Sequence, residues 1–177
     1  MRRQPRLAGL AVAGALLSAP AWAQAPPPPS APAQPAAASA SDASFIQAAV
    51  QADTDEIQMG QLLADRGSAR QVRAFGQMLV QDHTQSRQGA LAAAHAMGVV
   101  AAETMDADGV AADRDLHGRT GADFDREAKK LAIAAHQKAI ASFDHQVATG
   151  HGPAADYARQ TVPVLRRHLA AAQKLPG

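Results

Sequence analysis

The sequence reads Met78-Leu79-Val80-Gln81-Asp82-His83 near its middle, and this stretch decides the fold. With Val72 and Phe75 before it, the stretch places apolar residues every three or four positions, which predicts one buried face of a helix. That face ends in an acid and a histidine. Segments 131–136 and 162–168 also carry apolar runs that end in histidine. Polar groups at apolar positions of several helices therefore mark the candidate site.

The same spacing predicts four long helices and no strand. The first begins at a cap at Ser41 or Ser44, and the second follows a cap at Ser68 and ends at Gly98. The third covers about 123–149, and the fourth begins at Pro153. Since the first connection is only one or two residues long, we expect its two helices to be antiparallel neighbours.

Residues 99–121 are rich in aspartate and glycine and lack a strong apolar pattern. We expect a solvated crossover there, with a short helix around residues 110–116. Two helix pairs joined in this way predict an all-α fold, a ferritin-like antiparallel four-helix bundle with a long crossover between its second and third helices.

The N-terminal segment has the features of an export signal. Residues 1–23 combine three arginines, an apolar run and the small-residue site Ala21-Trp22-Ala23, which predicts a signal peptide. Residues 24–43 are almost entirely Ala, Pro, Ser and Gln, which predicts a disordered linker before a domain at 44–175. The expected location is periplasmic or secreted.

Composition excludes several classes of protein. The chain has no cysteine, so disulfides, thiolate metal sites and lipidated cysteines are excluded. Removal of the signal's three arginines changes the balance from 17 basic and 16 acidic residues to 14 and 16, which gives no reason to expect nucleic acid as a partner. No stretch after the signal is long and apolar enough to span a membrane.

Segments 45–63, 72–83, 124–136 and 162–169 together resemble the DUF4142 family. The resemblance implies a secreted bacterial protein with a ferritin-like four-helix fold, of a family often labelled as outer membrane proteins, and it implies no biochemical activity. The family usually carries an Asp-His pair on its third helix, where this chain has Ala135-His136.

Four residues, one from each predicted helix, form the candidate site: Glu56, His83, His136 and His168. Imidazole nitrogens and a carboxylate suit one ion of zinc, iron, manganese or copper. Asp82 points about 100° away from His83 on the helix, so we expect it to be an outer partner that bonds a ligand residue and does not touch the ion. The alternative is a hydrogen-bonded Glu-His network that only stabilises the bundle.

A carboxylate-bridged di-iron centre requires Glu-x-x-His motifs, but Val80 and Leu165 stand three positions before His83 and His168. No other catalytic motif occurs. The sequence thus predicts a non-enzymatic exported binding protein, with a role in envelope maintenance or stress and with an unknown envelope protein or a metal ion as partner. The alternative is a mononuclear metal-binding protein. Either is compatible with an oligomer.

Overall fold

The computed structural model describes residues 39–176, and within them the fold is all-α with five helices and no strand. The helices are α1 (Ala40–Arg66), α2 (Arg70–Ala96), α3 (Ala107–His117), α4 (Gly121–Thr149) and α5 (Gly152–Gln173). The predicted signal peptide and most of the predicted linker lie outside the described residues.

The start of α1 differs from the prediction. Its N-cap is Ser39, whose hydroxyl accepts a hydrogen bond from the amide of Asp42 at 3.0 Å and donates one to its carboxylate at 2.7 Å. The predicted caps Ser41 and Ser44 are wrong, because both lie inside the helix. The predicted linker therefore ends in residues that are helical, while the predicted stop at Gly67 is confirmed.

The predicted cap of α2 is also wrong, because Ser68 makes no side-chain cap and Ala69 holds the cap position. The carboxylate of Asp125 on α4 instead accepts from the amides of Ser68 and Ala69, at 2.9 and 2.7 Å. This acid satisfies the free amides at the start of the helix. At the other end, Gly98 follows with φ of 67°, a conformation that favours glycine.

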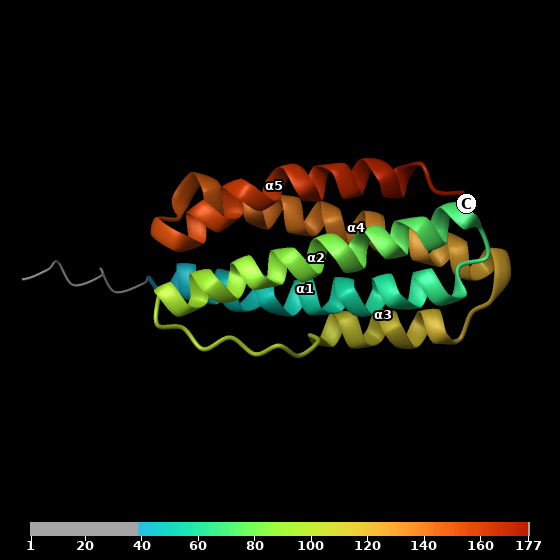
Figure 1. The fold of residues 1–177 in the computed structure, drawn as a ribbon, viewed down its shortest axis with the longest axis horizontal. Helices are drawn as coiled ribbons and strands as arrows, with labels where there is room; N and C mark the ends of the chain where they lie inside the picture. The colour runs from blue at the N-terminus through green and yellow to red at the C-terminus, as the bar shows by residue number, and fades with distance from the viewer. Residues whose placement is uncertain (1–38, 177) are drawn as a thin grey trace, which may run out of the picture. The chain divides into compact units, whose positions relative to one another are not determined.

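The four long helices lie side by side, and the short α3 lies against α1 (Figure 1). α1 pairs closely with α2, and α4 with α5, while α2 joins the two pairs by packing against α5. Gly60 and Gly76 allow α1 and α2 to lie close together, since a Cβ on Gly76 would lie 2.5 Å from the carbonyl oxygen of Gly60. α1 and α4 make few contacts with each other.

The expected crossover is present between α2 and α4, and its short helix is α3. Asp55 on α1 accepts a hydrogen bond from the amide of Asp106 at 3.1 Å, and Asp108 pairs with Lys138 on α4 at 2.7 Å. These contacts place α3 over the space between α1 and α4. No helix within residues 39–176 has the length and apolar character needed to cross a membrane.

Two apolar clusters fill the interior. One includes Ile46, Val50 and Phe143, and the other includes Leu63 and Phe124. On each long helix, residues of one cluster are followed by residues of the other, with a short polar interval between them. The candidate site occupies that interval.

Candidate functional site

The four predicted site residues come from α1, α2, α4 and α5 and are all buried, with 8% of Glu56, 3% of His83, 1% of His136 and none of His168 exposed. One ring nitrogen from each of the three histidines lies within 4.8 Å of the corresponding nitrogens of the other two. We call His83, His136 and His168 the histidine cluster. The structure therefore brings three of the four predicted ligands into one set.

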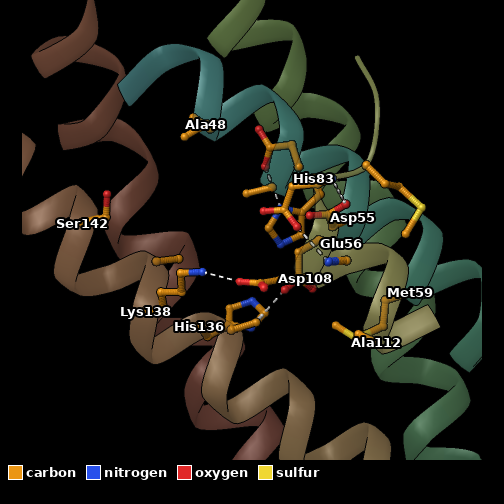
Figure 2. Close-up of a pocket in the computed structure, with 18 of the residues that line it drawn as sticks. Ala48, Asp55, Glu56, Met59, His83, Asp108, Ala112, His136, Lys138 and Ser142 are labelled. Atoms are coloured by element: carbon orange, nitrogen blue, oxygen red, sulfur yellow. Dashed lines mark hydrogen bonds and ion pairs between the residues drawn. The ribbon is translucent and has the colours of Figure 1, made fainter. Parts of the chain in front are cut away.

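Glu56 lies beside this set. Its Oε1 is 3.7 Å from Nδ1 of His136, and its Oε2 is a buried atom that pairs with nothing among residues 39–176. Burial raises the pKa of the Glu56 carboxyl, although the positive charge of His83 opposes that rise. Figure 2 shows Glu56 close to His83.

His83 is held from outside the cluster. Its Nδ1 donates to the carboxylate of Asp53 at 2.8 Å, because a carboxylate oxygen can only accept here. Tyr157 donates to the other oxygen of Asp53 at 3.0 Å and also bonds Ser86 at 2.8 Å. The opposite ring nitrogen of His83, Nε2, is buried and has no partner within the described residues. That nitrogen is free to meet a ligand.

The other two histidines are held in the same way. Nδ1 of His136 donates to the carbonyl oxygen of Ala132 at 2.8 Å, and Nε2 of His168 donates to the carboxylate of Asp82 at 2.8 Å. The remaining nitrogens, Nε2 of His136 and Nδ1 of His168, lie 3.3 Å apart. A neutral imidazole carries one N–H, so each of these nitrogens presents a lone pair to the other.

Burial keeps these two rings neutral. It lowers the pKa of His136 to about 4, aided by the charge of His83, and it lowers the pKa of His168 to about 4 despite the hydrogen bond to Asp82. His83 differs. Burial acts to lower its pKa, yet the hydrogen bond to Asp53 and the charge of Glu56 raise it above the usual value. The metal-free cluster therefore has one readily protonated ring and two neutral rings.

Asp82, expected as an outer partner, lies on α2 and bonds His168 on α5. The prediction did not include Asp53 or Tyr157, although both are buried and both act on His83 through hydrogen bonds. A sequence signal for Asp53 existed, since it stands three positions before Glu56 and so faces the same side of the helix. Tyr157 was indistinguishable from a core aromatic residue.

The donor set suits a first-row transition metal. Three imidazoles with hydrogen-bonded outer nitrogens form the usual arrangement of histidine ligands, once the ring of His83 has released its second proton. Tetrahedral zinc with bonds of about 2.0–2.1 Å places nitrogens about 3.4 Å apart. The close pair at 3.3 Å already has that spacing, whereas a pair at the 4.8 Å limit must close by about 1.4 Å as the rings move toward an ion.

A cavity of about 420 Å³ opens beside the cluster, between α1 and α4 and under α3. Its walls are mostly apolar, with alanine the commonest residue and Phe45 and Phe143 among them, and Glu56, His83 and His136 line its inner part. His168 is not among the lining residues. Figure 2 shows Ala48 of α1 and Ser142 of α4 on either side of this cavity.

The remaining polar lining residues are mainly acidic, and Lys138 is paired to one of the acids, Asp108. These acids are Asp53, Asp55, Asp106, Asp108 and Asp113. Burial and the neighbouring Asp106 raise the pKa of Asp55 to about 7. The cavity therefore combines apolar walls, one end at the histidine cluster and a surplus of carboxylates near α3.

Comparisons with known proteins found a matching family model and a solved structure with a similar fold. Residues 27–175 match DUF4142, described as a domain of unknown function. A crystal structure of a DUF305 fragment from Deinococcus radiodurans has a similar fold, with a TM-score of 0.69 and 17% sequence identity over 78% of this chain and 96% of that chain. No curated protein matches the sequence.

Proposed function

Because the chain belongs to the DUF4142 family, a domain of unknown function, we propose its function from its own site: it binds one divalent transition-metal ion inside a ferritin-like four-helix bundle. His83, His136 and His168 are the ligands, and Glu56 is the neighbouring carboxylate that offsets part of the charge of the ion. The protein acts by binding, and neither a di-iron centre nor turnover of a substrate is part of the proposal.

The observation that carries this proposal is the direction of the hydrogen bonds that the histidines make. His136 and His168 bond outward, to Ala132 and Asp82, so two neutral rings with one N–H each turn acceptor nitrogens toward each other across 3.3 Å. Two lone pairs at this distance repel each other, and a cation between them removes the repulsion. A metal ion would also use the free nitrogen of His83.

A purely structural network would look different. Buried polar groups are normally paired with each other, since an unpaired buried atom costs about 1–3 kcal/mol. Here Nε2 of His83 and Oε2 of Glu56 have no partner among residues 39–176, although both lie at the centre of the fold. The pattern is typical of a site that a ligand completes.

The ferritin-like arrangement is supported by the directions of the helices. α2 and α4 run the same way in Figure 1. The segment that holds α3 therefore runs back along the length of the bundle and connects the two antiparallel pairs. Such a bundle builds metal sites from side chains on facing helices. The predicted signal peptide at residues 1–23 supports a periplasmic or secreted location, where the protein serves envelope maintenance or stress.

Metal analysis of protein purified without an affinity tag tests the proposal, because a histidine tag would add metal. We expect about one ion of zinc, copper, iron or manganese per chain, and a melting temperature that falls when a chelator removes it. Protein that contains no metal and shows no change in melting with any of the four ions would refute the proposal. N-terminal sequencing of the protein recovered from culture fractions tests the export step.

A further inference from the structure

We propose that the cavity between α1 and α4 is a binding site for a small, largely apolar molecule whose single nitrogen or oxygen donor completes the coordination of the metal ion. This inference rests on the proposed function, because the ion supplies one of its two contacts. The molecule is neutral or cationic. Its apolar body lies against the alanine-rich walls, and its donor atom reaches the histidine cluster.

The position of the cavity carries the first step. His83 and His136 line it and His168 does not, so an ion held by the three nitrogens is open toward the cavity on the side of α1 and α4. Three histidines leave a tetrahedral ion with one free position. Oε2 of Glu56, which has no partner in the described part of the chain, lies at the same end. The cavity therefore leads to the open side of the ion.

The size and lining carry the second step. A volume of about 420 Å³ falls within the range of small-molecule sites, which are mainly apolar with a few polar groups that fix orientation. The lining alanines of α1 and α4 include Ala52, Ala135 and Ala139. Small side chains on facing helices normally permit close packing, yet these two helices make few contacts. The arrangement of the helices therefore keeps α1 and α4 apart at the cavity, since no large side chains of the described residues stand between these alanines to separate them.

Charge narrows the class of molecule. Asp55, Asp106, Asp108 and Asp113 line the cavity, and Lys138 is paired with Asp108. A surplus of carboxylates near low-dielectric walls repels anions and admits neutral or cationic molecules. Azoles have the required chemistry, since each combines an aromatic body with a neutral nitrogen donor that binds transition metals.

The test uses cobalt(II), whose visible absorption changes with its coordination, and 4-phenylimidazole as the probe. We expect the probe to change the spectrum of the cobalt-loaded full chain in a saturable manner. Ala139→Leu fills part of the cavity and should lower the affinity for the probe by at least about tenfold, or about 1.4 kcal/mol. Ala141→Leu on the same helix is the matched control, because Ala141 is exposed and does not line the cavity.

Cobalt binding is measured in every sample. If Ala139→Leu fails to fold or to bind cobalt, Ala48→Leu serves instead, since Ala48 is an exposed lining residue on the opposite wall. A spectrum that the probe leaves unchanged, or changes equally in the wall variants and the control, overturns the inference while cobalt binding upholds the proposed function. A chain that binds no cobalt and none of the four metals above overturns both.

Discussion

Replacement of His136 by Leu should abolish stabilisation by metal while leaving the metal-free protein almost unchanged. Nδ1 of His136 bonds only the carbonyl oxygen of Ala132 in its own helix, and no charge is lost because burial lowers the pKa of His136 to about 4. Its other nitrogen faces the lone pair of His168. The substitution therefore removes one hydrogen bond within α4 and the 3.7 Å contact of His136 with Oε1 of Glu56, and no closer contact with a carboxylate.

The magnitudes separate the two effects. Loss of the hydrogen bond to Ala132 costs about 0.5–1.5 kcal/mol, and the added apolar burial of leucine offsets part of that cost. At about 3–4 °C per kcal/mol, we expect the metal-free melting temperature to change by less than about 4 °C. An ion at 100 times its Kd stabilises the native state by about 2.7 kcal/mol, or about 8–11 °C.

The assay is thermal unfolding followed by circular dichroism, with each protein measured in chelator and in the presence of the ion that co-purifies. The melting temperature of the wild-type protein should rise by the full amount when metal is added, and that of His136→Leu should not. His95→Leu is the matched control and should retain the rise, because His95 is exposed near the end of α2. A rise that survives in His136→Leu refutes the assignment of this ligand. A large loss of stability without metal would favour the structural network.

Three further outcomes follow from the structure. Asp82→Asn, which weakens the acceptor for His168, should lower metal affinity about 10–100-fold in a competition titration with a chelator, whereas Asp144→Asn at the exposed Arg166 pair should not. Gly76→Ala should lower the free energy of unfolding in urea by about 1–3 kcal/mol, because the helices must separate, while Gly89→Ala, with only ordinary contacts at 3.4 Å, should not destabilise. Hydrogen bonds, foremost the one from Ser39, lower the pKa of Asp42 below its ordinary value of 3.8. The stability that the Asp42 carboxylate contributes is therefore present above about pH 3.8 and is lost as the pH falls through the pKa of the folded state. Asp42→Asn should lower the melting temperature at pH 7 and should match the wild-type protein at more acidic pH.

The helices and the burial of the site residues were predictable because both depend on local spacing. An apolar stripe that repeats every three or four residues fixes which face of a helix is buried, and each of the four polar residues interrupts such a stripe. The position of Gly98 after α2 was predictable for a similar reason, because a helix end favours glycine locally.

Features that depend on contacts between distant segments were not predictable. Asp125 caps α2 from another helix, 56 and 57 residues along the chain from the amides it binds. The spacing of apolar residues placed Glu56 on the buried face of α1. Its distance from the histidine cluster, however, depends on how far α1 stands from α4. The cavity depends on the same separation. A stripe of alanines is compatible with both close and open packing, so the sequence could not distinguish them.

The polar interval between the two apolar clusters has a physical cost that favours a functional interpretation. Two neutral imidazoles with facing lone pairs add little cohesion to the interior, and apolar side chains of similar volume would stabilise it more. The outer acceptors nevertheless fix both rings in this orientation, through the carbonyl oxygen of Ala132 and the carboxylate of Asp82. These acceptors therefore contribute little to the stability of the fold. Their main effect is to aim the two inner nitrogens at a common point. The arrangement becomes favourable once a cation lies between the rings, so the stability of this bundle should depend on its ion more than on the histidines themselves.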